Sequence, residues 1–311
     1  MGSVRQGIPA PYVVLVEAPR LFRLPDGRTL AYDDVGDPNG MPVVYLHGTP
    51  DSRLARHPDD GVAERAGARL ISVDRPGAGD SDHHPAGTLT SSGDDLGQLL
   101  DHLRIERAAL LGWSAGGLFA IAVASVLRDR VLAVGLIGTL PPAEAYDDLD
   151  LVAALGPGRR NFVELARELT PRELAAELVA YLVPQPLTPE LALQHVLESA
   201  GERGREELIG VPGAAEQLAR ALEASVQSGV AGLQHDIALQ LEPGLDLSTV
   251  SAPVRTFHGA QDGVSPPVVG AWLASHLPHG VLDLVPGAGH HLLFPRWRGI
   301  LRAVLRDALN Q

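Results

Sequence analysis

The sequence predicts an α/β protein with a mostly parallel central sheet that carries helices on both faces. Short apolar segments of strand length alternate along the chain with segments of helical spacing, which is the pattern of strand-helix-strand units. The chain is also long enough, at 311 residues of which 45% are hydrophobic, to bury one large core. We therefore expect one main domain with room for an insertion.

The first elements are expected to be a hairpin followed by alternating strands and helices. Residues 22–24 and 29–32 flank Asp26 and Gly27, a turn pair typical of an antiparallel hairpin. A helix is expected around residues 96–103, where leucines recur at the spacing of one helix face. Further strands are expected at residues 42–46, 69–74, 107–111, 131–138, 254–258 and 281–285.

The composition changes after residue 142, where strand patterns stop. Residues 143–247 carry helical periodicity in short pieces separated by glycine or proline. Thr170 and Thr188 each precede a proline, which is typical of a helix N-terminus. We expect a helical cap, or lid, of residues 143–247 inserted into a core domain of residues 1–142 and 248–311. Its expected helices span residues 144–155, 161–169, 171–182, 189–200, 214–226 and 230–241.

Ser114 lies in a Gly-x-Ser-x-Gly pattern where a predicted strand runs directly into a predicted helix. A serine on such a tight turn has a strained backbone and an exposed hydroxyl, and its neighbours two residues away must be nearly without side chains. Gly112 and Gly116 meet that requirement. In a chain with 34 glycines the pattern also fits a plain strand-to-helix turn, so its interpretation depends on the rest of the sequence.

Four further segments each lie at the end of a predicted strand, as Ser114 does. They read HGTPDS at residues 47–52, DRPGAGDSD at 74–82, GAQDGVSP at 259–266 and PGAGHH at 286–291. Together with GWSAGG at 112–117, they make the chain resemble the alpha/beta-hydrolase superfamily. The resemblance covers residues from about 21 to 140 and from 250 to 309. It implies an alpha/beta-hydrolase fold with the helical insertion acting as a lid.

The resemblance implies a role for each catalytic candidate. Ser114 would be the nucleophile, His290 the base, and Asp262 the residue that orients the histidine. The backbone N–H groups of Thr49 and Ala115 would form the oxyanion hole. Two alternatives stay open. Asp262 precedes a glycine and could be only a turn-forming residue, and His291, which follows His290, could be the base instead.

Three aromatic residues are candidates for contact with a substrate. Trp113 precedes Ser114, whereas Phe162 and Tyr181 lie in the expected cap. Aromatic residues make up only 4% of the chain, and each offers a large rigid contact surface. Packing among the cap helices is an equally good explanation for Phe162 and Tyr181.

The resemblance favours a serine hydrolase that cleaves a carboxylic ester, lactone or thioester of an apolar small molecule through an acyl-enzyme. Carbon-carbon bond hydrolases and cofactor-free haloperoxidases share the same residues. A proline iminopeptidase is disfavoured, because its oxyanion loop reads HGGPG where residues 47–51 read HGTPD. A serine at position 114 argues against haloalkane dehalogenases and epoxide hydrolases, which have an aspartate there. A non-hydrolytic biosynthetic enzyme or a ligand receptor on the same scaffold remains an alternative.

The composition excludes several other kinds of chemistry. Cysteine is absent, so thiolate nucleophiles, disulfides and Cys-ligated metals are excluded. All 25 basic residues are arginine, which excludes lysine Schiff bases. Asp80, Asp82, His83 and His84 lack the helical spacing of a zinc motif, and residues 287–292 depart from a dinucleotide-binding fingerprint. We expect no metal and no cofactor.

The charge and hydropathy of the chain bear on its partners and location. A net charge of −13 disfavours nucleic-acid binding, which needs a basic face. No stretch approaches the roughly 20 apolar residues of a membrane span. The apolar run at residues 12–16 is too short for a signal peptide. We expect a cytoplasmic protein whose partner is a small-molecule substrate.

Overall fold

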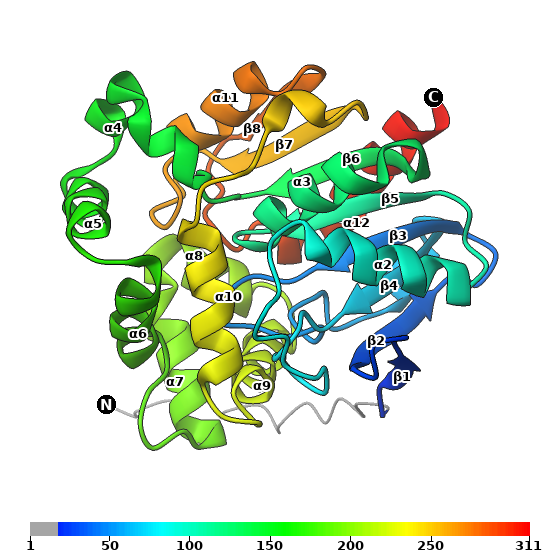
Figure 1. Ribbon diagram of the computed structural model, residues 1–311, viewed down its shortest axis with the longest axis horizontal. Helices are drawn as coiled ribbons and strands as arrows, with labels where there is room; N and C mark the ends of the chain where they lie inside the picture. Colours follow the sequence, from blue (N-terminus) through cyan, green and yellow to red (C-terminus); the bar gives the residue numbers. More distant parts are fainter. Residues whose placement is uncertain (1–17) are drawn as a thin grey trace, which may run out of the picture.

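The computed structural model describes residues 18–311 and contains one eight-stranded sheet (Figure 1). The apolar run at residues 12–16 lies outside the described residues. In space the strands follow the order β1-β2-β4-β3-β5-β6-β7-β8. Their bounds are β1 (Arg20–Arg23), β2 (Thr29–Gly36), β3 (Met41–Leu46), β4 (Ala68–Val73), β5 (Ala108–Trp113), β6 (Val131–Ile137), β7 (Val254–Gly259) and β8 (Gly280–Val285).

The sheet is mostly parallel, as the sequence predicts. Strands β1 and β2 form the predicted antiparallel hairpin, in which Arg20 pairs with Tyr32. Strand β2 is also antiparallel to β4, and the remaining pairs are parallel. Parallel strands bring their carboxyl ends to one edge, so the loops after β3, β5, β6, β7 and β8 meet there.

Helices cover both faces of the sheet because its central strands are buried on both sides. Along β3, Val43 and Tyr45 pack into the core layer beneath α12, whereas Val44 and Leu46 pack toward α2 and α3. The helices of the two faces are α1 (Gly61–Glu64), α2 (Ser91–His102), α3 (Gly116–Leu127), α11 (Pro267–His276) and α12 (Leu293–Leu309). A short 3-10 helix, η1 (Arg128–Arg130), links α3 to β6.

Residues 143–249, between β6 and β7, are helical, and we call them the inserted helices. Figure 1 shows α5 to α10 gathered beyond one edge of the sheet. The bounds are η2 (Ala143–Asp147), α4 (Leu149–Ala154), α5 (Pro157–Glu168), α6 (Pro171–Leu182), α7 (Pro189–Ser199), α8 (Gly201–Ile209), α9 (Ala214–Ser225), α10 (Ala231–Leu241) and η3 (Leu247–Thr249).

The inserted helices agree with the sequence pattern except at three places. Helix α5 begins at Pro157, four residues before the expected start at residue 161. Thr170 and Thr188 cap α6 and α7 as expected, and each accepts a hydrogen bond from the backbone three residues later. The prediction of a single helix at residues 144–155 is wrong, because Asp148 forms the N-cap of α4 and separates this helix from η2. Helix α8 was not predicted, since it begins at Gly201 and contains Gly204, which lower its helix propensity.

None of the helices formed by residues 18–311 is both long and apolar enough to cross a membrane.

Candidate active site

Ser114 stands at the end of β5 in a backbone conformation that side chains rarely adopt. Its φ is 53°, and its N–H donates to the carbonyl of Ile137, which ends β6, at 2.8 Å. A Cβ on Gly112 would lie 2.4 Å from the carbonyl oxygen of Gly116, and one on Gly116 would lie 2.2 Å from that of Leu46. Both glycines are therefore required by close backbone approach, and the turn presents the serine at the carboxyl edge of the sheet.

Asp262 and His290 are joined by a buried hydrogen bond. The distance between Asp262 Oδ2 and His290 Nδ1 is 2.8 Å. The other carboxylate oxygen, Oδ1, accepts the backbone N–H groups of Val264 at 2.9 Å and Ser265 at 2.8 Å. Asp262 therefore both forms the turn after β7 and orients the histidine, so the two interpretations of this residue are compatible.

The charge of Asp262 is stabilised in spite of its burial. Burial raises the pKa of this carboxyl, but the interaction with His290 and the backbone hydrogen bonds lower it, and the net pKa lies below its ordinary value. A carboxylate that accepts from Nδ1 fixes the His290 proton on that nitrogen and leaves Nε2 as an acceptor. His290 and Ser114 line the same cavity.

Two residues that the sequence analysis did not single out for these roles support this pair. His258, at the end of β7, lies with Nε2 3.6 Å from Asp262 Oδ2 and 2.8 Å from the carbonyl oxygen of Ser265. Trp113 donates from Nε1 to the carbonyl oxygen of His290 at 3.0 Å. The loop that carries His290 is therefore held at both its side chain and its backbone.

Thr49 and Ala115 carry the backbone N–H groups that are expected to form the oxyanion hole. Neither donates a hydrogen bond to any other group within residues 18–311. The Thr49 hydroxyl, in contrast, donates to Asp236 Oδ2 at 2.8 Å and accepts from Gln240 Nε2 at 3.0 Å. Both partners come from α10, so an inserted helix holds the loop that carries the Thr49 N–H group. We call this loop, residues 47–51 after β3, the oxyanion loop.

Arg75 also holds the oxyanion loop in place through hydrogen bonds. Its guanidinium donates to the carbonyl oxygens of His47 and Gly48 and to both carboxylate oxygens of Asp236, at 2.7 and 2.9 Å. It also donates to the Thr49 hydroxyl at 2.8 Å and lies 4.4 Å from the ring centroid of Phe119. Arg75 belongs to the DRPGAGDSD segment at residues 74–82, and these contacts give it a structural role.

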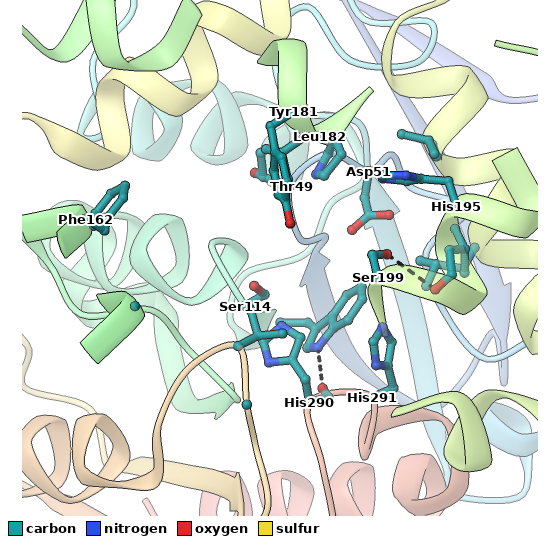
Figure 2. Close-up of a pocket in the computed structure, with 18 of the residues that line it drawn as sticks. Thr49, Asp51, Ser114, Phe162, Tyr181, Leu182, His195, Ser199, His290 and His291 are labelled. Atoms are coloured by element: carbon teal, nitrogen blue, oxygen red, sulfur yellow. Dashed lines mark hydrogen bonds between the residues drawn. The ribbon is translucent and has the colours of Figure 1, made fainter. Parts of the chain in front are cut away.

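A cavity of about 620 Å³ opens beside Ser114 (Figure 2). The three aromatic candidates, Trp113, Phe162 and Tyr181, all line it, although Tyr181 is 79% exposed. The cavity also has polar lining residues that were not predicted to contact a substrate, namely Asp51, His195, Ser199 and His291, the last of which was the alternative base. They lack a recognisable spacing, since they come from a loop after β3, from α7 and from the loop after β8.

His291, the alternative base, differs from His290 in its surroundings. Within the described chain it is His290 that contacts Asp262, whereas the buried Nδ1 of His291 has no hydrogen-bond partner. Burial, with the neighbouring His290, lowers the pKa of His291 to about 3. A Cβ on Gly204 would lie 2.6 Å from its Nδ1, so α8 packs directly against this ring.

Glu207 connects α8 to residues 286–292, the loop that carries His290, which we call the histidine loop. Its side chain is buried, and Oε1 accepts the N–H of Gly289 at 2.7 Å. Burial raises the pKa of this carboxyl above its ordinary value, although the Gly289 N–H and Arg203 act in the opposite direction. The residue next to His290 is therefore fixed by an inserted helix.

A family model described as the alpha/beta hydrolase fold matches residues 41–296. The chain belongs to this family. It is 28% identical over 263 residues to the pimeloyl-[acyl-carrier protein] methyl ester esterase of Nitrosomonas europaea, which covers 83% of this chain and 92% of that protein. It is also 28% identical over 280 residues to BpoC of Mycobacterium tuberculosis, which is named as a non-heme bromoperoxidase. That match covers 89% of this chain and 96% of BpoC.

Two further similarities concern length and fold. The chain spans about half the length (52%) of the acetyltransferase component of the acetoin cleaving system of Pseudomonas putida, with 29% identity over 198 residues, or 60% of this chain. Among solved structures, the esterase RhEst1 from Rhodococcus sp. ECU1013 superposes with a TM-score of 0.64 at 22% identity. That match covers 94% of this chain and 99% of RhEst1 and supports the fold.

Proposed function

We propose that this protein is a serine hydrolase that cleaves a carboxylic ester, lactone or thioester of a largely apolar small molecule. The observation that carries the proposal is the 2.8 Å hydrogen bond between Asp262 and His290 at a cavity where Ser114 is held at a φ of 53°. Similarity to an ester hydrolase over most of both chains supports the same reaction class.

In the proposed reaction, Ser114 Oγ attacks the carbonyl carbon while His290 Nε2 takes the hydroxyl proton. The N–H groups of Thr49 and Ala115 bind the oxyanion. When the tetrahedral intermediate collapses, the histidine gives its proton to the leaving alcohol or thiol, and an acyl-enzyme remains. Water then attacks the acyl carbon, loses a proton to His290, and releases the carboxylic acid and the free Ser114 hydroxyl.

In this proposal the inserted helices act as a cap over a core formed by the rest of the chain. Support comes from the cavity lining, to which α5, α6, α7 and α9 all contribute side chains. Phe162, Tyr181 and Trp113 would contact the apolar part of the substrate. A cap in this position also shields the reacting groups from bulk solvent while the cavity admits the water that hydrolyses the acyl-enzyme.

The test is multiple turnover of p-nitrophenyl esters by the wild type and by Ser114→Ala. We expect the substitution to lower kcat/KM by at least about 10³-fold, because only binding and oxyanion stabilisation would remain. Ser275→Ala, at an exposed serine on α11, is the matched control. A Ser114→Ala enzyme that keeps more than a tenth of the wild-type rate would refute the assignment, and a single slow acylation without turnover would favour a receptor.

Similarity to BpoC favours haloperoxidase activity without a cofactor as a second candidate. Assaying the same two variants for halogenation, with hydrogen peroxide, halide and a carboxylic acid supplied, separates it from ester hydrolysis.

A further inference from the structure

The cavity wall contains a carboxyl group that the proposed reaction does not use. Asp51 lies two residues after Thr49, lines the cavity that also contains Ser114, and is only 7% exposed. Figure 2 shows its carboxyl pointing into the cavity. Across the part of the chain that the structure describes, this carboxyl makes neither a hydrogen bond nor an ion pair, although Asp and Glu are rarely buried unless paired.

The nearest charged groups are already occupied. Arg75 influences Asp51, but its guanidinium donors go to Asp236, to the Thr49 hydroxyl and to two backbone carbonyls. Asp236 adds a second negative charge to the surroundings. Burial raises the pKa of Asp51 well above its usual range, and Arg75 offsets only part of this effect.

The local backbone leaves room for this carboxyl. A Cβ on Gly48 would lie 2.7 Å from Asp51 Oδ2, so any side chain at position 48 would displace the group. The carboxyl therefore sits in a space that the oxyanion loop provides, and its burial without a partner is unfavourable for folding. A group that destabilises the free protein in this way is typical of a binding site.

The rest of the cavity indicates what could bind there. Its lining includes the apolar side chains of Phe162, Leu182 and Leu218 and the polar side chains of His195 and Ser199. An apolar cavity with a few convergent polar groups selects a ligand that is mainly hydrocarbon with one polar substituent. A carboxyl accepts a hydrogen bond in either protonation state, so a donor on the ligand would satisfy it.

We propose that Asp51 is a specificity-determining residue whose carboxyl binds a hydrogen-bond donor, a hydroxyl or an ammonium group, carried by the substrate away from the reacting carbonyl. This inference rests on the proposed ester hydrolysis and narrows its substrate class to hydroxy- or amino-substituted esters. An ester with only hydrocarbon substituents leaves the carboxyl without a partner and is the poorer substrate.

The experiment compares matched esters that differ in one group. The substrates are p-nitrophenyl alkanoates of increasing chain length, each made with a terminal methyl, hydroxyl or ammonium group on the acyl chain. A second series consists of alkyl esters that carry the same three groups at the end of the alcohol. The readout is the ratio of kcat/KM between the substituted and the plain ester, measured in one preparation so that the folded fraction cancels. The enzymes are the wild type, Asp51→Ala, Asp51→Asn, Ser114→Ala and, as a control, Asp94→Ala at an exposed position on α2.

We expect the wild type and Asp94→Ala to prefer a donor-bearing ester by about 3- to 10-fold at the matching chain length. Asp51→Ala should bring the ratio close to about one, and Asp51→Asn, which keeps an acceptor oxygen, should retain part of the preference. A preference for the hydroxyl or for the ammonium ester identifies which donor the site takes.

Other outcomes overturn the inference. Ser114-dependent hydrolysis without any donor preference, or with a preference that persists in Asp51→Ala, refutes the role of Asp51 and leaves the proposed function standing. Absence of Ser114-dependent hydrolysis refutes the proposed function and this inference with it. Thermal unfolding provides an independent check, because removing an unpaired buried carboxyl group should leave the Tm of Asp51→Asn equal to or above that of the wild type. A clearly lower Tm would show a structural role instead.

Discussion

Replacing Asp236 by asparagine should weaken both the fold and the oxyanion loop. Asp236 makes a two-point ion pair with Arg75, and the side chains of the pair are 11% and 3% exposed. Its Oδ2 also accepts the Thr49 hydroxyl at 2.8 Å and Gln240 Nε2 at 2.9 Å. The substitution keeps the size of the side chain but removes its charge, and it replaces one acceptor oxygen with an N–H donor facing Arg75.

The size of the effect follows from the partners that Arg75 keeps. Removing one member of a buried ion pair costs about 3 to 5 kcal/mol, because the other charge remains buried without compensation. Arg75 still donates to the carbonyl oxygens of His47 and Gly48, so the lower part of that range applies. We expect the free energy of unfolding to fall by about 3 kcal/mol. The one oxygen of the amide can accept the Thr49 hydroxyl or face Arg75 Nε, but not both, so fewer hydrogen bonds hold Thr49 and Arg75 together. We therefore expect kcat to fall by roughly 10-fold with a smaller change in KM.

Urea unfolding and steady-state ester hydrolysis measure the two effects. Asp101→Asn is the matched control, since Asp101 pairs with Arg130 at 2.7 Å but is 70% exposed, and we expect it to cost less than about 1 kcal/mol. If Asp236→Asn were no more destabilising than Asp101→Asn and left kcat unchanged, the ion pair would not hold the loop.

Two further predictions concern the histidine loop. Glu207→Ala removes the acceptor of the Gly289 N–H and should lower kcat more than it raises KM, whereas Glu207→Gln keeps an acceptor and should restore most of the rate; equal effects of the two variants would count against a positioning role. His291 has a pKa of about 3 in the folded protein against 6.5 as its ordinary value, so between these values the unfolded state binds more protons and stability decreases as the pH falls. At pH 5 this amounts to about 2 kcal/mol, and denaturant titrations at pH 7 and pH 5 should show a smaller acid destabilisation for His291→Gln than for the wild type; an equal destabilisation in the two proteins would contradict the shift.

The strands, the order of the loops and the position of Ser114 followed from local sequence patterns. Apolar segments of strand length and glycines around a serine are signals that neighbouring residues carry, and parallel strands then place their following loops at one edge. The placement of Asp262 and His290 depended on resemblance to a family, because their 28-residue separation has no local meaning.

The residues that hold the site could not be predicted in this way. Asp236 contacts Arg75 across 161 positions, and Glu207 contacts Gly289 across 82. Each is a charged residue on a helix, and a charged side chain is ordinarily expected at a solvent-exposed position. Asp51 belongs to the HGTPDS segment, but the burial of its carboxyl depends on how the loop folds over Gly48.

The contacts of the inserted helices predict that substrate preference and catalytic rate can be changed separately. Helices α8 and α10 bind the histidine loop and the oxyanion loop through Glu207 and Asp236, so substitutions there should lower kcat for all esters alike. Phe162, on α5, lines the cavity, so Phe162→Ala should instead change the ranking of acyl-chain lengths, by about 1 to 3 kcal/mol in kcat/KM between the best and worst chains. Measuring kcat/KM across a series of p-nitrophenyl esters for the wild type, Glu207→Ala and Phe162→Ala tests this division. A uniform decrease for Phe162→Ala, or a changed ranking for Glu207→Ala, would mean that the inserted helices act as one unit on both properties.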